Sequence, residues 1–181
     1  MRILPVLILA PFLAACASLT EEQCQSGNWS GIGYNDGLNG RSAEYIGNHF
    51  EACADLGISP DIAAWQTGRE QGLLQYCTPE NAYITGRNGD RFNNVCPTDQ
   101  STNLSLAYGW GGEYFDITQE IFTLTEEKYE LELIIASDLS HPDLTPEQAA
   151  QLAQLNSRIR LIDIKIRRLT RQRERYAFLP R

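Results

Sequence analysis

The chain has 181 residues, a formal net charge of -8 and a sequence pI near 4.8. This acidic balance argues against a general nucleic-acid-binding protein, because such proteins neutralise phosphates with an excess of Lys and Arg. The length suits one modest domain with an appendage.

The first fifteen residues have the pattern of a secretory signal. Arg2 precedes an apolar run from 3 to 15, which is shorter than the roughly 20 residues that span a membrane. Leu13-Ala14-Ala15-Cys16 matches a lipobox, in which acyl chains are attached to the sulfur and the freed amine of the cysteine. We therefore expect a signal peptide at 1–15 and lipidation of Cys16, with an ordinary secreted protein as the alternative.

The predicted anchor places the mature chain in the cell envelope, and we expect residues 16–26 to form a lipidated tether. Ala17 and Ser18 follow the anchor, and the absence of an Asp there favours the outer membrane, facing the periplasm, over the inner membrane. Two or more acyl chains hold a protein stably to a bilayer. The lipid is therefore the predicted membrane attachment.

Four further cysteines occur in the predicted exported chain, an even number that indicates two disulfides. Three pairings are possible, and we favour Cys24–Cys53 with Cys77–Cys96 because these pairs close local loops. A zinc site is the alternative, since His49 stands one helical turn before Cys53. We expect no metal and no cofactor.

Residues 27–112 are rich in Gly, Asn and aromatic residues and contain a loose repeat of an aromatic residue followed by glycines. Ser59-Pro60 predicts a helix N-terminus, with Ser as the cap and Pro at the first position. In the helix that follows, Gly68 and Gly72 lie one turn apart. Each glycine costs about 1 kcal/mol in a helix relative to Ala, so the pattern indicates a close helix crossing.

Four earlier glycines permit two interpretations. Gly33, Gly37, Gly40 and Gly47 line one face if a single helix runs to about Cys53, which is the interpretation we favour. Alternatively, 35–37 (Asn-Asp-Gly) forms the turn of a hairpin.

Several motifs within residues 27 to 100 resemble a family of predicted bacterial lipoproteins that is catalogued only as a domain of unknown function. The resemblance implies that Cys53, Cys77 and Cys96 belong to the family pattern, and it supplies no activity. The motifs are Gly-Tyr-Asn-Asp-Gly at 33–37, Gly-Arg-Glu-Gln-Gly-Leu at 68–73, Tyr-Cys-Thr at 76–78, Gly86 with Gly89, and Val-Cys-Pro at 95–97.

From Glu113 onward glycine disappears and apolar residues recur at alternating spacings of three and four, which is a heptad pattern. We expect a helical hairpin over 113–181 with arms at about 114–137 and 146–177. Thr145-Pro146 followed by Gln148 predicts the start of the second arm through a capping box. At 1.5 Å per residue, the second arm outruns the first.

The first predicted arm is acidic and the second is basic, so antiparallel pairing sets opposite charges together. Exposed pairs contribute about 0–1 kcal/mol each, mainly to register. The functional alternative is that the overhanging end of the second arm binds an anionic partner such as phospholipid, lipopolysaccharide or an acidic protein. Its candidate residues are Arg167, Arg168 and Arg171.

The sequence contains no recognisable nucleophile, metal or phosphate-loop motif, and we predict no catalytic residue. A glycan hydrolase using Asp36 with Glu44 or Glu70 is the enzymatic alternative, because such enzymes use paired carboxylates. A third hypothesis is an anion or small-ligand site formed by Arg41, Arg69 and Arg87, each of which follows a glycine.

The sequence thus predicts a mainly α protein. A small glycine-rich, disulfide-held head precedes an antiparallel coiled-coil hairpin. The favoured function is that of a non-enzymatic envelope lipoprotein whose hairpin binds a protein partner or a second copy, with no nucleic-acid partner.

Overall fold

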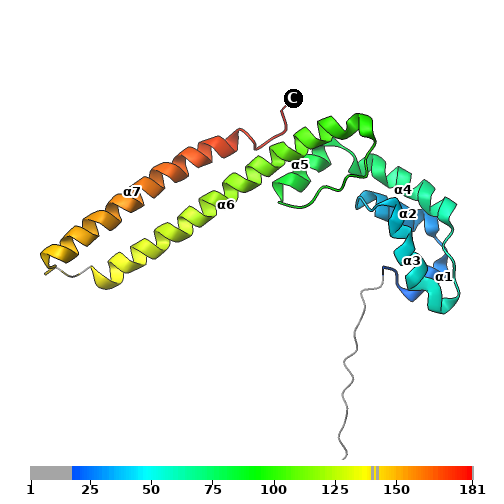
Figure 1. Cartoon of the computed structure of the whole chain (residues 1–181), viewed down its shortest axis with the longest axis horizontal. Helices are drawn as coiled ribbons and strands as arrows, with labels where there is room; N and C mark the ends of the chain where they lie inside the picture. The colour runs from blue at the N-terminus through cyan, green and yellow to red at the C-terminus, as the bar shows by residue number, and fades with distance from the viewer. Residues whose placement is uncertain (1–17, 140, 142, 181) are drawn as a thin grey trace, which may run out of the picture. The chain divides into compact units, whose positions relative to one another are not determined.

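The structure is a computed structural model that describes residues 18–139, 141 and 143–180. The predicted signal peptide and Cys16 lie outside these residues. The described part is mainly helical and contains no strand, which confirms the predicted fold class at that level (Figure 1). The chain divides into two compact units, Met1–Leu73 and Leu74–Arg181, which we describe separately.

The first unit contains α1 (Glu21–Ser26), α2 (Trp29–Leu38), α3 (Ile46–Cys53) and most of α4 (Ile62–Tyr76). The predicted Cys24–Cys53 disulfide joins α1 to α3 within its core. The buried core residues are Leu19, Cys24, Trp29, Cys53 and Trp65.

The described part of the expected tether belongs to this core instead. Leu19 is buried and Cys24 is 1% exposed. Thr20 and Gln23 form a capping box that starts α1. From Ser18 onward the segment expected as a lipidated tether over 16–26 is packed against the first unit, because burial and the disulfide fix it.

Helix α4 begins at Ile62, two residues later than Ser59-Pro60 predicts. The carboxylate of Asp61 accepts a hydrogen bond from the backbone N–H of Ala64 at 3.0 Å. Asp61 thus satisfies one of the free donors at the helix start, as a capping residue does.

Helices α2 and α4 cross with their backbones in contact, as the glycine spacing of α4 predicts. A Cβ on Gly68 would overlap the carbonyl oxygen of Ser30, and a Cβ on Gly33 would overlap that of Trp65. One turn later, Gly72 and Gly37 make the same reciprocal contact. The contacts advance in the same direction along both helices, so α2 and α4 run parallel.

The single helix predicted to run to Cys53 is wrong, because the chain turns at Gly40. Gly40 has φ +61°, a conformation that favours glycine. The N–H of Arg41 donates to the carbonyl of Asp36 at 2.9 Å and closes the end of α2. The hairpin alternative at 35–37 is also wrong, since these residues are helical.

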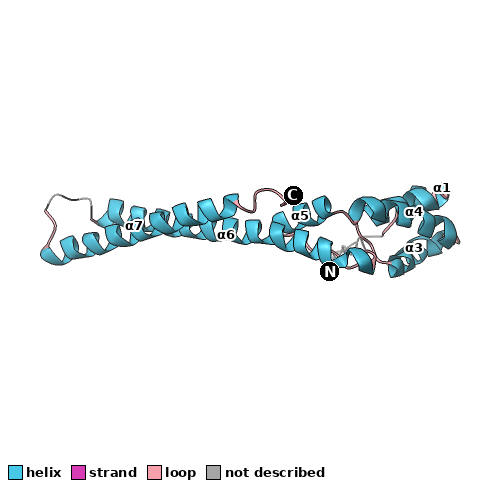
Figure 2. Ribbon diagram, turned by 90° about the horizontal axis from the view of Figure 1, so that it is seen from above, coloured by secondary structure: helices cyan, strands magenta, loops and turns pink. Residues whose placement is uncertain are grey.

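The second unit contains α5 (Pro79–Arg87), α6 (Ser101–Asp138) and α7 (Pro146–Glu174). The Cys77–Cys96 disulfide forms as predicted. Helices α6 and α7 lie side by side and antiparallel in both views (Figures 1 and 2), and the predicted capping box at Thr145 starts α7. Among the described residues, no helix is both long enough and apolar enough to span a bilayer.

The crossing of α5 and α6 repeats the glycine contact of the first unit. A Cβ on Gly86 would overlap the carbonyl oxygen of Tyr108, and a Cβ on Gly111 would overlap that of Tyr83. Segments 34–40 and 83–89 both read Tyr-x-x-Gly-x-Asn-Gly and end in the same backbone turn. The loose sequence repeat therefore encodes a repeated helix crossing.

The change of composition at residue 112 falls inside α6 rather than between structural parts, because Gly111 serves helix packing. Helix α6 starts at Ser101, well before the predicted start at 114. The second arm therefore does not outrun the first, and the predicted overhang is wrong. Leu169 of α7 packs in one cluster with Ile117 of α6.

We predict that Gly68→Ala destabilises the first unit by about 3 kcal/mol or more, because the added methyl overlaps a backbone carbonyl that cannot rotate away. Gly47→Ala is the matched control. A Cβ on Gly47, also helical, meets open space, so this change should stabilise by about 0.5–1 kcal/mol. Denaturant unfolding of both variants measures the difference, and equal effects would contradict the crossing.

Candidate functional site

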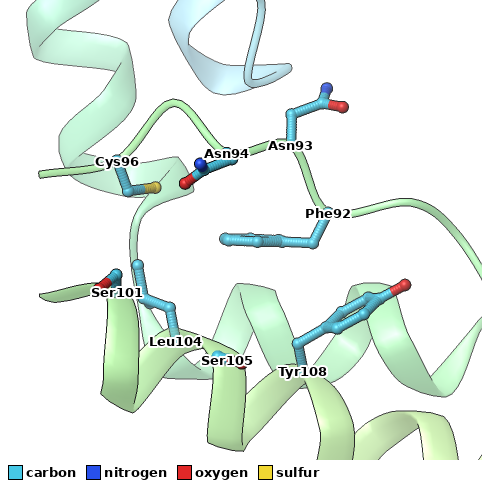
Figure 3. A pocket seen from close by; sticks show the side chains of 8 residues that line it. All are labelled: Phe92, Asn93, Asn94, Cys96, Ser101, Leu104, Ser105 and Tyr108. Atoms are coloured by element: carbon cyan, nitrogen blue, oxygen red, sulfur yellow. The ribbon is translucent and has the colours of Figure 1, made fainter. Parts of the chain in front are cut away.

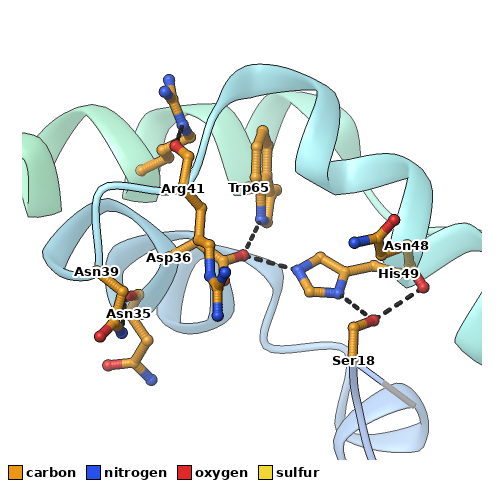
Figure 4. Close-up of polar contacts among 9 residues, drawn as sticks. Ser18, Asn35, Asp36, Asn39, Arg41, Asn48, His49 and Trp65 are labelled. Atoms are coloured by element: carbon orange, nitrogen blue, oxygen red, sulfur yellow. Dashed lines mark hydrogen bonds and ion pairs between the residues drawn. The ribbon is translucent and has the colours of Figure 1, made fainter. Parts of the chain in front are cut away.

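A buried polar network in the first unit joins the start of the described chain to three helices (Figure 4). The carboxylate oxygen Oδ2 of Asp36 on α2 accepts hydrogen bonds from Nε2 of His49 at 2.7 Å and Nε1 of Trp65 at 2.8 Å. The other ring nitrogen of His49 lies 2.9 Å from Oγ of Ser18. His49 is 1% exposed.

Ser18, His49 and Asp36 are in contact with one another in the same order as the residues of a catalytic triad. The hydrogen bonds of the serine nevertheless do not suit nucleophilic catalysis. Oγ of Ser18 donates to the backbone carbonyl of Asn48 at 2.8 Å, and a hydroxyl has one proton to give. The hydroxyl of Ser18 is thus engaged by the backbone of α3 as well as by the ring of His49. The network instead holds Ser18 against α3.

The hydrolase alternative gains no support from this arrangement. Asp36 is 13% exposed and is engaged by two N–H donors on one oxygen, whereas Glu44 and Glu70 are exposed. The Ser42 hydrogen bond lowers the pKa of Glu44, which keeps that carboxyl ionised rather than available as a general acid. Asp36 therefore has a structural role in the first unit.

Arg41 and Arg69 are brought together, but through the backbone. Nε of Arg69 donates to the carbonyl oxygen of Arg41 at 2.7 Å. Arg69 is 9% exposed, and burial lowers its pKa against the opposing influence of nearby carboxylates. The guanidinium of Arg41 lies over the ring of Tyr45, 4.6 Å from its centroid. Arg69 therefore stabilises the turn after α2 and is not available to bind an anion at the surface.

Arg87 belongs to the second unit, and its guanidinium also has internal partners. It lies 4.1 Å from the ring centroid of Tyr114, and it donates to the carbonyl of Ala177 at 3.0 Å. Tyr83 donates to the carbonyl of Tyr176 at 2.7 Å. These bonds fasten the segment after α7 to α5, a role that the sequence alone does not indicate.

Two cavities in the second unit are poor candidates for a ligand site, because one is small and the other has few polar groups in its lining. The first, about 200 Å³, lies beside Cys96 and has the ring of Phe92 in its wall (Figure 3). This volume is below the roughly 300–1,000 Å³ typical of ligand pockets. The adjacent Tyr76 hydroxyl accepts from the N–H of Asn93 at 2.7 Å, and burial raises the pKa of Tyr76. The second, about 390 Å³, is mostly apolar and is bordered by Trp110 and Leu179.

The zinc alternative is not supported, because the sulfur of Cys53 is bonded to that of Cys24 in a disulfide. Both ring nitrogens of His49 are hydrogen-bonded, one to Asp36 and one to Ser18. No group of three or more possible metal ligands occurs among the residues that the structure describes.

The surface of α6 and α7 combines ion pairs with exposed apolar side chains. Arg158 pairs with Glu127 and Lys165 pairs with Glu120, so part of the predicted acidic-to-basic pairing forms. The hydrogen bond to Asp163 raises the pKa of Lys128. Arg167, Arg168 and Arg171 are exposed on α7, and the exposed apolar residues of the two helices are Leu106, Phe122, Tyr129, Leu133, Ile134, Leu161 and Ile164.

We predict that Asp36→Asn lowers the free energy of unfolding of the first unit by about 1–3 kcal/mol, because the charged acceptor of two buried donors is lost. Glu70→Gln, which changes an exposed carboxylate in the same way, should stay within about 0.5 kcal/mol. Denaturant unfolding gives both values. An unchanged stability of Asp36→Asn would remove the structural role that we assign to Asp36.

Comparison with known proteins gives a family match over part of the chain and no activity. No curated protein and no solved structure matches the chain. Residues 28–113 match the model of a family described as a protein of unknown function (DUF2799), which confirms the resemblance to a domain of unknown function.

Proposed function

We propose that this chain is a lipid-anchored cell-envelope protein, non-enzymatic, whose α6–α7 hairpin is a coiled coil that mediates interaction. The observation that carries the anchoring is the lipobox at 13–16 after a short basic and apolar segment. We favour the outer membrane, facing the periplasm, as its location. The two disulfides agree with an oxidising compartment.

The fixed position of Ser18 bears on how the anchor would act. Ser18 is held by Asn48 and His49, and only Ala17 separates it from Cys16. Since an extended chain spans at most about 3.6 Å per residue, the first unit would lie within roughly 7 Å of the lipid-bearing residue. Such a short link would hold this unit at the membrane surface, whereas a long flexible linker would let it move away from the membrane.

The hairpin supports the interaction role through its spacing and its exposed surface. Ile117, Leu124 and Leu131 of α6 recur every seven residues and pack with Ile162 and Leu169 of α7, also seven apart. This spacing supports the proposed coiled coil. Apolar side chains outside the seam stay exposed, as they do at protein interaction sites.

The polar chemistry of the first unit supports a non-enzymatic role. Asp36, His49 and Ser18 satisfy one another and the backbone, and His49 is inaccessible to a substrate. Active sites instead place titratable groups in an open cleft.

We predict that Cys16→Ser moves the chain from the membrane fraction to the periplasmic fraction, because the acyl acceptor is lost. Ser18→Ala, two residues away, retains the cysteine and should leave the chain in the membrane. Fractionation with mass spectrometry of the N-terminal peptide checks both. Membrane retention of unacylated Cys16→Ser would refute the lipid anchor.

A second prediction concerns the basic side of α7. In-cell crosslinking from exposed positions on α7 should capture an envelope protein or a second copy. If an anionic partner is recognised by Arg167, Arg168 and Arg171, neutralising these exposed residues should abolish capture. Capture that is indifferent to the three charges would exclude the anionic-partner hypothesis. No crosslink at all would withdraw the interaction role.

A further inference from the structure

Helix α6 carries a second apolar stripe in addition to the one that faces α7. Phe122 and Tyr129 are seven residues apart and are 62% and 57% exposed. Thr118 and Thr125 alternate with them at spacings of four and three. This alternation is the pattern that packs against another helix, and the described part of the chain leaves the two aromatic rings uncovered.

The ion pairs of the hairpin identify the side on which this stripe lies. Glu120–Lys165 and Glu127–Arg158 close one edge of the seam between α6 and α7, at 2.7 and 2.6 Å. The stripe lies at the opposite edge. There Arg173 approaches the hydroxyl of Thr118 at 3.5 Å.

The charges beside the stripe have opposite signs on its two flanks. Arg160 and Arg167 of α7 lie within one helical turn of Asp163, whose bond to Lys128 marks the same edge. Glu126 of α6 is one turn from Phe122 on the flank away from α7. Among the described residues, Arg160, Arg167 and Glu126 form no ion pair, and the arginines and the glutamate are exposed.

We propose that the Phe122–Tyr129 stripe, comprising residues 118, 122, 125 and 129, binds the same stripe of a second copy of this chain. The two α6 helices are parallel and in register. Phe122 meets its counterpart, as does Tyr129, so that both aromatic rings leave water.

Charge determines the direction of pairing. In a parallel pair of helices, the two flanks of one seam face the opposite flanks of the other, whereas in an antiparallel pair like flanks meet. A parallel pair therefore sets Glu126 of each copy beside Arg160 on α7 of the other. The height also fits, because Arg160 lies between Arg158 and Asp163, which contact residues 127 and 128 of α6. An antiparallel pair sets arginines against arginines.

This inference rests on the proposed function, since it names the partner of the hairpin as a second copy. Two copies anchored to one membrane meet at a raised effective concentration, which favours a weak dimer. Their common anchoring side also suits a parallel arrangement of identical helices.

Cysteine crosslinking tests the pairing on the full lipidated chain in envelope preparations and on purified unlipidated Cys16→Ser chain. Thr125→Cys places a thiol on the stripe, and Glu132→Cys places one seven residues further along the same side of α6. Thr123→Cys and Glu130→Cys are matched controls, with the same residue types two positions earlier on the opposite edge. The native cysteines of the described chain are already in disulfides, so the introduced thiol is the one that reacts.

We expect disulfide-linked dimers from both Thr125→Cys and Glu132→Cys and little from the two controls. A parallel in-register pair brings both positions together with themselves, whereas an antiparallel pair allows at most one. Dimers from only one of them, or equal dimers from the controls, would overturn the proposal. So would the absence of dimers from the lipidated chain.

Sedimentation of the purified Cys16→Ser chain adds a quantitative test without new thiols. The double variant Phe122→Ala/Tyr129→Ala should raise the dissociation constant of the dimer at least about tenfold, because two exposed rings lose their contact. Leu161→Ala, at an equally exposed residue of α7 on the other edge, should leave it unchanged. Equal effects would refute the stripe as the interface.

The two proposals fail in distinguishable ways. A chain that is anchored and captures a different envelope protein, yet forms no stripe crosslink, retains the proposed function and loses the dimer. A chain that dimerises through the stripe but is not acylated retains the dimer and loses the anchor.

Discussion

Direct backbone contact between helices is the constraint on which the fold depends. At the α2–α4 and α5–α6 crossings a glycine on each helix lies against a carbonyl of the other, at a separation that leaves no room for a Cβ. Such closeness permits weak Cα–H···O contacts and dense packing. It also explains why so small a first unit tolerates glycines that cost about 1 kcal/mol each in a helix. The burial of Trp65 and the Cys24–Cys53 disulfide complete that core.

The polar network is a consequence of the same crossing. Because α2 and α4 approach closely, Asp36 on one helix reaches Trp65 on the other, and α3 brings His49 to the same carboxylate oxygen. Hydrogen bonds to a charged group contribute roughly 1.5–3 kcal/mol, whereas an unpaired buried donor is costly. Asp36, a candidate catalytic acid by sequence, thus has a structural role that accounts for its presence, because it links three helices. The bond from His49 to Ser18 extends this order toward the N-terminus.

The sequence predicts the elements whose signals are local. The capping box at Thr145, the two short-range disulfides and the close crossing at Gly68 all follow from spacing and residue type. The failures concern context. The glycines near residue 112 are predicted to mark a boundary, but they lie within α6, where Gly111 serves helix packing. Gly40 is predicted to be helical, but its φ is positive and the chain turns there. The hydrogen-bond partners of Arg69 and Arg87 are distant in the chain. A local sequence pattern therefore cannot distinguish an arginine that bonds the protein's own backbone from one that binds an anion at the surface.

The features that support the proposed interaction role lie on the surface of the described chain. The buried His49 and Arg69 of the first unit have hydrogen-bond partners within it, and the larger of the two cavities in the second unit has few polar groups with which to orient a ligand. The long hairpin, by contrast, exposes aromatic rings at helical spacing beside charges that have no internal partner among the described residues. Burial of an aromatic ring against a partner is favourable, and the seven-residue spacing of Phe122 and Tyr129 suits the packing of one helix against another. The contacts of the proposed interaction role are accordingly expected along α6 and α7, where these rings and charges are exposed.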